Sequence, residues 1–479
     1  MSGAATPGPG TTSPVAHRRT RRGVELALLA GAIGLAVLAY VQVGLTVQGT
    51  VPPSTLGYAL GLTALFGLAH LVVRRVAPDA DPLILPCVAA LNGLGLALIH
   101  RLDLAASERA RAAGRALPRA DAPLQLIWTA VGVLGFLAVL LLLRDHTRLA
   151  RYTYTSAAVG LVMLLIPAVP GVGATINGAR LWVRVGPMTV QPSEVAKVSL
   201  IVFFAGYLVA KREVLSLAGR RLVGLTLPRA RDLGPVLVAW AASIAVLAGE
   251  NDLGTPLLFF GIFTVMLYIA TERISWLLLG LALFVASSFV AYHLFGHVAK
   301  RVDTWLDPFA QASGSSYQLV QGLFGFGTGG LTGTGLGGGS PQIVPFAKTD
   351  FIMATIGEEL GLVGVMAVLV VFGLIVSRGL RAALSCRDEF GTLLAAGLSF
   401  SLALQVFVIV GGVMGLIPLT GVTLPWLSYG GSSIVVNWVI AGLLLRISDA
   451  ARRPAAVAAA PVQLRVAISE APTTIVRRP

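Results

Sequence analysis

A charged pair opens one of the long apolar stretches of this sequence. In Gln191-Pro-Ser-Glu194-Val-Ala-Lys197 a carboxylate and an ammonium stand three residues apart, so on a helix they share one face. Charged side chains inside an apolar segment cost free energy and by default indicate a functional site. The pair could instead simply neutralise itself at a helix end, and the two interpretations are compatible.

Further acidic groups interrupt other apolar segments. Asp252, within Glu250-Asn-Asp252-Leu-Gly-Thr255, separates two apolar runs and fits a tight turn as well as a functional site. Asp350 opens another run, where its main expected role is that of a helix N-cap. Glu358 and Glu359 follow about 12–13 Å along the same predicted helix, too deep for capping. We therefore expect at least one of these two to face a polar cavity or a cation.

Two short segments carry weaker signals. Arg180 stands two residues before Trp182, where it could bind an anionic head group or, equally well, form an interfacial anchor beside the indole. Gly333-Thr-Gly335-Leu-Gly-Gly338 fits G-x-G-x-x-G, but a dinucleotide site also needs a preceding strand and a following helix. A flexible glycine-rich loop over a cavity is the better interpretation. Cys87 and Cys386 are the only cysteines, which excludes a disulfide framework or a Cys-rich metal site, and no metal site is predicted.

The elements that hold these residues are predicted to be membrane helices. Of the 479 residues, 56% are hydrophobic and 12% are charged, whereas soluble proteins have about 45–50% apolar and about 25% charged residues. A soluble enzyme is excluded, and the net charge of +14 reflects membrane topology rather than nucleic-acid binding. Stretches long enough to cross a bilayer predict an all-α polytopic membrane protein with about 12 transmembrane helices. They lie near 24–46, 56–73, 82–100, 124–143, 152–169, 193–210, 235–249, 253–271, 275–297, 350–377, 391–417 and 425–445.

The distribution of Lys and Arg predicts the orientation of these helices. Most of the basic residues fall on the cytoplasmic side when both termini are cytoplasmic, as the positive-inside rule requires. The exception is a predicted outer loop with five arginines between Arg101 and Arg119. The long loops 170–192 and 298–349 then face away from the cytoplasm, where chemistry proceeds without ATP. Residues 1–23, which are basic, and 447–479 are predicted to be disordered tails.

Taken together, these segments resemble the SEDS family (shape, elongation, division and sporulation), of the RodA/FtsW type. The matching stretches follow the order of the family over about 175–446, and the region from Gly411 to Arg453 is closer to actinobacterial, RodA-like members. Because such proteins usually have ten spans, residues 24–123 are expected to add N-terminal transmembrane helices and a loop. Residues 124–446 then form the catalytic core, with the outer loop 298–349. The matches are Asn177-Gly-Ala-Arg180-Leu-Trp182, Gly186-Pro187, Gln191-Pro-Ser-Glu194 with Lys197, Asp252-Leu-Gly-Thr255, Tyr317-Gln318, Gly333-Thr-Gly335-Leu-Gly337, Thr349-Asp350-Phe351, Gly357-Glu358-Glu359-Leu-Gly361, Pro418-Leu-Thr-Gly421 and Pro425-Trp426-Leu-Ser428-Tyr429-Gly-Gly431-Ser-Ser433.

The resemblance implies a peptidoglycan glycosyltransferase of the bacterial cytoplasmic membrane, acting in cell elongation. Such enzymes polymerise lipid II outside that membrane and release undecaprenyl pyrophosphate, and the resemblance implies a class B penicillin-binding protein as transpeptidase partner. Positive charge near the phosphates would come from Arg180, Lys197 and Lys348. No cofactor is certain, and a divalent cation stays open because no complete ligand set is legible. The other expected substrate-binding residues are Glu194, Asp252, Asp350, Glu358 and Ser428.

The sequence departs from this family at the position that matters most for the reaction. Counting forward from Arg301 and back from Tyr317 places Gln311 where the family has its catalytic aspartate. An amide cannot act as a general base at neutral pH. Either this form of the enzyme is inactive or impaired, or another group is the base. Asp307 is the nearest substitute, although a turn role before Pro308 suits it better.

Two rival functions stay open. Gln311 favours a non-catalytic scaffold that binds lipid II and recruits or regulates the penicillin-binding protein. The buried acidic residues favour a flippase for a lipid-linked precursor, but the inverted repeats typical of transporters are not evident. Movement of labelled lipid II across liposomes would separate the flippase from a polymerase.

Overall fold

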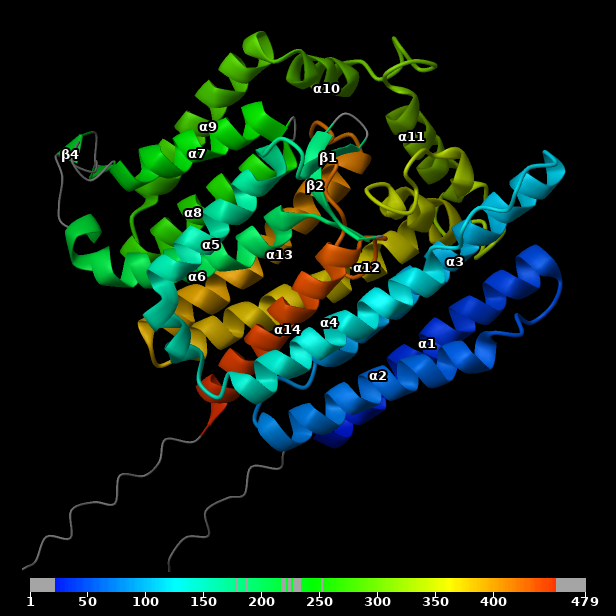
Figure 1. The fold of residues 1–479 in the computed structure, drawn as a ribbon, viewed down its shortest axis with the longest axis horizontal. Helices are drawn as coiled ribbons and strands as arrows, with labels where there is room; N and C mark the ends of the chain where they lie inside the picture. Colours follow the sequence, from blue (N-terminus) through cyan, green and yellow to red (C-terminus); the bar gives the residue numbers. More distant parts are fainter. Residues whose placement is uncertain are drawn as a thin grey trace, which may run out of the picture.

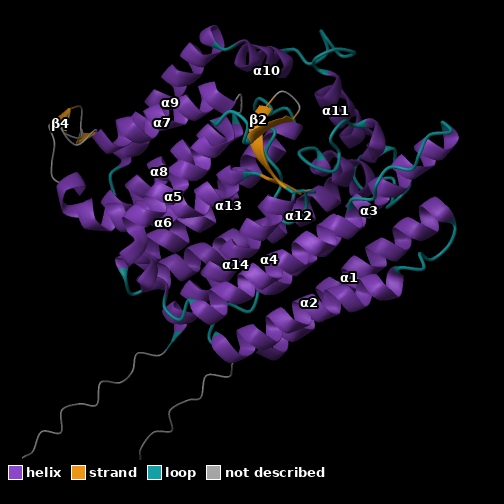
Figure 2. Cartoon of the chain, viewed as in Figure 1, coloured by secondary structure: helices purple, strands orange, loops and turns teal. Residues whose placement is uncertain are grey.

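The computed structural model describes residues 22–176, 179–186, 188–216, 221–222, 225–226, 234–250 and 253–453. Most of them form long apolar helices (Figure 2), as expected for segments whose backbone polar groups must be satisfied within lipid. The helices are α1 (Arg22–Gln48), α2 (Thr55–Val76), α3 (Ile84–Ala112), α4 (Ala122–Leu142), α5 (Thr153–Leu165), α6 (Pro192–Ser216), α7 (Gly234–Glu250), α8 (Gly254–Thr271), α9 (Ile274–Leu294), α10 (Gly296–Leu306), α11 (Tyr317–Gly329), α12 (Ile352–Ser385), α13 (Glu389–Val413) and α14 (Gly431–Arg452).

The predicted number of spans is confirmed to within one helix. Among the described residues, eleven segments are long and apolar enough to cross a membrane. One of them joins the 3-10 helices η1 (His146–Tyr152) and η2 (Ile166–Ala168) to α5. The remaining predicted span, 235–249, corresponds to α7, which has 17 residues. The chain is therefore a multi-pass membrane protein.

The bundle has two distinct ends (Figure 1). The first and last described residues, Arg22 and Arg453, lie at the same end, which we call the tail end. The opposite, loop end carries α10, α11 and a small sheet. α14 continues to Arg452, past the predicted start of the tail at 447, because Asp449 is buried there and pairs with Arg453 at 2.6 Å.

The predicted all-α fold class is confirmed, and the two predicted long loops contain short regular elements. Residues 170–192 hold a three-stranded antiparallel sheet of β1 (Gly173–Ile176), β2 (Ala179–Val185) and β3 (Met188–Val190). Residues 298–349 hold most of α10, all of α11 and the 3-10 helix η4 (Pro341–Ile343). A short pair, β4 (Arg221–Leu222) and β5 (Leu225–Thr226), lies elsewhere. These strands and helices are too short for the spacing of their apolar residues to predict them from the sequence.

The N-terminal helices pack firmly against the rest of the bundle. α1 lies along α3, and α2 lies against α4. The Glu25 carboxylate is fully buried in α1, where it contacts Arg22 and forms a hydrogen bond with His70 Nδ1 at 2.8 Å. The ring of Tyr40 stacks on those of Tyr58 and His100. Whether residues 24–123 form a separate unit stays a prediction.

A kink in α12 positions the glycine-rich segment at the loop end. Gly361 interrupts the helix with φ +66°, a conformation that favours glycine. A Cβ at Gly361 would also lie 2.3 Å from the backbone N of Gly333. The amides of Leu362 and Val363 donate to the carbonyls of Gly330 and Leu331, at 2.9 and 3.1 Å. The glycine-rich segment is thus held against the kink by backbone hydrogen bonds.

Candidate active site

Gln311 lies in the exposed turn between α10 and α11. Its carbonyl oxygen accepts hydrogen bonds from the amides of Gly314 and Ser316, at 2.9 and 3.3 Å. Its side-chain Oε1 accepts one from the Ser315 hydroxyl at 2.7 Å. The amide therefore shapes the turn, and it has no basic site to offer a substrate hydroxyl.

Asp307, the proposed substitute base, stands at the start of the same turn. It is exposed, and its Oδ1 accepts a hydrogen bond from the amide of Ala310 at 3.1 Å. This is the arrangement of a turn-forming aspartate. The structure thus displays its turn role, and a role as base stays a prediction.

Asp350 lies just before α12, in a partly buried position. It accepts a hydrogen bond from the Thr349 hydroxyl at 3.0 Å. Arg301 of α10 and Gln318 of α11 lie near it, but burial outweighs them and raises the pKa of Asp350 to about 6. The expected N-cap role is wrong, because α12 begins at Ile352 with Phe351 as its N-cap and no side chain caps it.

This shifted pKa predicts a pH-dependent stability. The Asp350 carboxyl is protonated more readily in the folded protein than in the unfolded chain. Its contribution to the free energy of unfolding is therefore most favourable at low pH. That contribution is lost as the pH rises from about 4 to about 6. We expect Asp350→Asn to raise the thermal midpoint at pH 7.5 but not at pH 4, measured by unfolding of the purified protein across this range. Equal changes in midpoint at both pH values would contradict the assignment.

Lys348 is held by two carboxylates instead of facing open space. Its Nζ donates to Asp103 Oδ1 at 2.5 Å and to Asp121 Oδ2 at 2.8 Å. Burial favours the neutral amine, but these hydrogen bonds outweigh it and raise the pKa of Lys348. Tyr429 lies beside the same group, and burial together with Asp121 raises its pKa to about 12. A phosphate at Lys348 would have to compete with both carboxylates.

Ser428 joins two segments of the loop end. Its hydroxyl donates to the carbonyl of Thr349 and accepts from the amide of Leu424 at 2.9 Å. The amide of the next residue, Tyr429, donates to the carbonyl of Lys348 at 2.7 Å. The structure thereby brings Lys348, Asp350 and Ser428 together, although the Ser428 hydroxyl is occupied by backbone groups.

The two adjacent glutamates of α12 have different partners. Glu358 accepts a hydrogen bond at Oε1 from the amide of Ser340 at 2.5 Å. Glu359 is fully buried, and its Oε1 accepts from Arg101 Nε at 2.9 Å. Arg101 also donates through Nη2 to the carbonyl of Gly339 at 2.8 Å. The expectation that one glutamate faces a cation is confirmed, and both anchor the glycine-rich segment.

Arg101, Asp103 and Asp121 were not predicted as partners of the site residues. Arg101 pairs with Glu359, and the two aspartates pair with Lys348. Arg101 was expected in an outer loop, whereas α3 extends to Ala112 and carries this side chain with 3% exposure. The arginines of this segment did not fit the positive-inside rule. That conflict was the sign in the sequence that one of them could be buried and paired. A basic residue that is paired and buried need not obey that rule.

Glu194 and Lys197 form the predicted pair on one face of α6. Lys197 Nζ donates to Glu194 Oε2 and to Gln405 Oε1, both at 2.8 Å, and both charged residues are at most 5% exposed. Gln405 of α13 in turn donates to the carbonyl of Thr423 at 2.8 Å. The pair thus connects α6 to α13 and to the segment before α14.

Arg180 belongs to β2, and Asp252 lies outside the described residues. Arg180 Nη2 donates to the carbonyl of Val169 at 3.1 Å, while its Nε is buried and makes no hydrogen bond within the described part of the chain. A small hollow lined by Gly171–Thr175 and Arg184 lies beside it. Arg180 is only partly buried, so an anion could reach its terminal guanidinium nitrogens but not the buried Nε.

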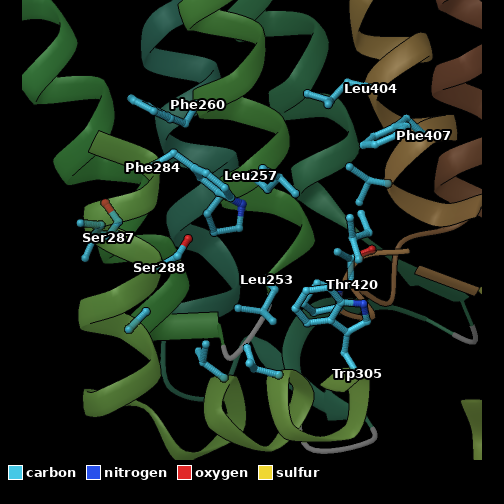
Figure 3. A pocket seen from close by; sticks show the side chains of 18 of the residues that line it. Leu253, Leu257, Phe260, Phe284, Ser287, Ser288, Trp305, Leu404, Phe407 and Thr420 are labelled. Carbon is cyan, nitrogen blue, oxygen red and sulfur yellow. The ribbon is translucent and has the colours of Figure 1, made fainter. Parts of the chain in front are cut away.

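An apolar cavity of about 460 Å³ opens among α7, α8, α9, α10 and α13. Figure 3 shows Phe260, Phe284, Leu404 and Phe407 around it, with Trp305 at one end. Trp305 belongs to α10, as do the lining residues Val298 and Val302. α10 ends at Leu306 and leads directly into the turn that holds Gln311. The cavity therefore ends close to the chain segment that carries Gln311.

Comparisons with known proteins agree with this architecture. The model of the cell cycle protein family FtsW/RodA/SpoVE matches residues 82–453, and so includes α3 to α14. The peptidoglycan glycosyltransferase RodA of Mycobacterium tuberculosis is 51% identical over 436 residues, 91% of this chain and 92% of that protein. Stage V sporulation protein E of Bacillus subtilis is 34% identical, over 68% of this chain and 87% of that protein.

Solved structures share the fold. One similar structure comes from work on the structural coordination of polymerization and crosslinking by a peptidoglycan synthase complex. It has a TM-score of 0.58 and 27% identity, and the match covers 78% of this chain and 99% of that chain. A mutant of the rod shape determining protein RodA of Thermus thermophilus has a TM-score of 0.52 and 25% identity, with the same coverage.

Proposed function

Because this chain belongs to the FtsW/RodA/SpoVE family of cell cycle proteins, we propose that it is a peptidoglycan glycosyltransferase that polymerises lipid II. In this reaction a sugar hydroxyl of the acceptor loses its proton and its oxygen attacks the anomeric carbon of the donor. The bond from that carbon to the pyrophosphate breaks, and undecaprenyl pyrophosphate leaves. The enzyme must therefore hold two long prenyl chains, receive a proton and stabilise a pyrophosphate.

The apolar cavity is the observation that carries this proposal. Its volume of about 460 Å³ lies in the range of small-molecule sites, and its wall is almost entirely aliphatic and aromatic. A prenyl chain comes to this cavity from the hydrocarbon of the bilayer, so its binding there would depend on van der Waals packing against these side chains rather than on transfer from water. Since α10 connects this cavity to the Gln311 turn, a lipid tail in it would place its head group near that turn.

Arg180 is the cation best placed to receive the phosphates. Lys197 and Lys348 are each held by carboxylates, whereas Arg180 is partly exposed and donates to a backbone carbonyl. Guanidinium groups bind phosphate through paired donors. The two lysines would then hold the structure of the site and contribute to its electrostatic field.

Gln311 makes this member a weak polymerase. Its amide cannot take the proton of the acceptor hydroxyl, and the exposed Asp307 is engaged in its turn. The acceptor would then react mainly with water as the proton acceptor, while binding of lipid II is retained. If the loss of the base abolished polymerisation completely, the protein would be an inactive scaffold for a class B penicillin-binding protein.

The orientation follows from the same proposal. The loop end would face the outside of the bacterial cytoplasmic membrane, where lipid II is consumed, and both termini would lie in the cytoplasm. A class B penicillin-binding protein would supply the transpeptidase step next to the growing strand. Elongation rather than division is favoured by the 51% identity to mycobacterial RodA.

Polymerisation of labelled lipid II by the purified protein, with its transpeptidase supplied, tests this function. We expect short glycan strands to accumulate slowly and their formation to need the lipid tail. Movement of labelled lipid II across liposomes without strand formation would instead support a flippase. Binding of lipid II with neither activity would support the scaffold.

A substitution in the cavity should weaken lipid binding selectively. Ser288 of α9 lines the cavity, so Ser288→Phe fills part of it. We expect crosslinking to photoactivatable lipid II to fall about tenfold, with a smaller loss for a short-tailed analogue. Leu281→Phe on the exposed face of the same helix is the matched control. Equal binding by the two variants would argue against the cavity as the tail site.

A further inference from the structure

Three potential metal ligands converge at the tail end of the bundle, remote from the site described above. His146 begins η1, directly before α5, and Cys386 and Asp388 lie in the turn between α12 and α13. Their ligand atoms all lie within 4.8 Å of one another. The residues come from segments 240 positions apart, so the cluster exists only in the folded chain.

The separations of the three ligand atoms suit one small ion. His146 Nε2 lies 2.8 Å from Asp388 Oδ2, Cys386 Sγ lies 3.2 Å from the same oxygen, and Sγ and Nε2 are 3.8 Å apart. Three atoms at these separations are all about 2 Å from a common point, and zinc binds nitrogen, oxygen and sulfur at about 2.0–2.3 Å. The ligands therefore need little movement to receive it.

The residues around the cluster orient two of its ligands. The amide of Gly391 donates to Asp388 Oδ1 at 2.6 Å, which leaves Oδ2 directed at the other two groups. His146 is 2% exposed, its Nδ1 makes no hydrogen bond within the described residues, and Asp145 Oδ1 lies 3.8 Å from it. A carboxylate beside the outer nitrogen of a ligating histidine is a usual feature of zinc sites.

Glycine at 391 is required for this convergence. A Cβ there would lie 2.4 Å from His146 Nε2, 2.6 Å from Cys386 Sγ and 2.8 Å from Asp388 Oδ2. Any other residue would push the three ligand atoms apart. The same glycine donates the N-cap hydrogen bond of α13 to Asp388, so the turn that caps this helix also holds the cluster together.

We propose that His146, Cys386 and Asp388 form a zinc site that joins the start of α5 to the α12–α13 turn. A neutral imidazole, a thiolate and a carboxylate would balance the two charges of the ion, and binding would release the thiol proton. Nitrogen and sulfur donors favour zinc over magnesium or calcium. Cys386 and Asp388 are half-buried, so water can occupy the fourth position. The ion would thereby link helices that are otherwise joined at this end by hydrogen bonds.

Cobalt titration of the full-length, tag-free protein in detergent, after removal of metals by EDTA, tests this site. We expect a single equivalent of Co²⁺ to produce the near-ultraviolet charge-transfer band of a cobalt–thiolate bond, and Zn²⁺ to displace it. Cys386→Ser should abolish the band and weaken Zn²⁺ binding at least tenfold. Cys87→Ser, which changes the other cysteine in α3, should behave as the unchanged protein.

Thermal unfolding gives a second readout that does not depend on the absorption band. Zn²⁺ should raise the midpoint of the unchanged protein and of Cys87→Ser, but not that of Cys386→Ser. Absence of the band in the unchanged protein, or equal Zn²⁺ binding by Cys386→Ser, would overturn the proposal. The cluster would then be only a hydrogen-bonded contact between η1 and the cap of α13.

Discussion

Replacing Gln311 with Asp should raise the rate of lipid II polymerisation by about 10²–10⁴-fold, the usual contribution of a positioned general base. The substitution shortens the side chain by one methylene and converts an amide into a carboxylate in an exposed turn. The hydrogen bond from the Ser315 hydroxyl to Oε1 can be kept by a carboxylate oxygen. Folding should therefore change little, and the gain should appear in the rate of strand formation.

Two further variants show whether the gain comes from the carboxylate. Gln311→Asn has the shape of the Asp variant without its charge, and it should stay as slow as the unchanged protein. Asp307→Ala should leave the Gln311→Asp variant active. If the unchanged protein already polymerises at the rate of Gln311→Asp and loses this rate on Asp307→Ala, then Asp307 is the base and the alignment at Gln311 has no catalytic consequence.

Replacing Arg101 with Met should destabilise the protein by about 3–5 kcal/mol, the usual effect of removing one partner from a buried ion pair. Arg101 is 3% exposed and Glu359 is fully buried, so the carboxylate would lose the counter-charge and the hydrogen bond that Arg101 supplies. The contact from Arg101 to the carbonyl of Gly339 would be lost as well. We expect a lower thermal midpoint together with loss of polymerisation, because the glycine-rich segment is no longer held.

The double variant Arg101→Met/Glu359→Gln separates charge burial from packing. It removes the unpaired charge, so it should recover most of the lost stability. Arg109→Met is the control on the same helix, since Arg109 is exposed and contacts the carbonyl of Gln342 at 2.7 Å. Similar destabilisation by the Arg101 and Arg109 variants, or no recovery in the double variant, would show that the pair is not the main source of stability here.

The candidate site was predicted unevenly from the sequence. Glu194 and Lys197 were expected to pair, and they do, because three residues of helix place them on one face. Asp350 was expected to cap a helix, but α12 begins beyond it and the side chain lies near Arg301 and Gln318. Its surroundings come from α10 and α11, which the sequence reading treated as loop. The apolar cavity could not be located from the sequence, because side chains from α7 to α10 and from α13 enclose it only in the folded chain.

That this chain crosses a membrane many times can be read from the order of its residues, because the length of an apolar stretch is a local property and a bilayer requires a minimum length. The order of the family motifs and the presence of Gln311 are also read directly along the chain. The pairing of the charged side chains, in contrast, depends on the tertiary structure. Arg101 and Glu359 are 258 positions apart, and Lys348 meets Asp103 and Asp121 from α3 and the start of α4. Such partners depend on which helices pack side by side, and a buried charge is stable only where that packing supplies its counter-charge.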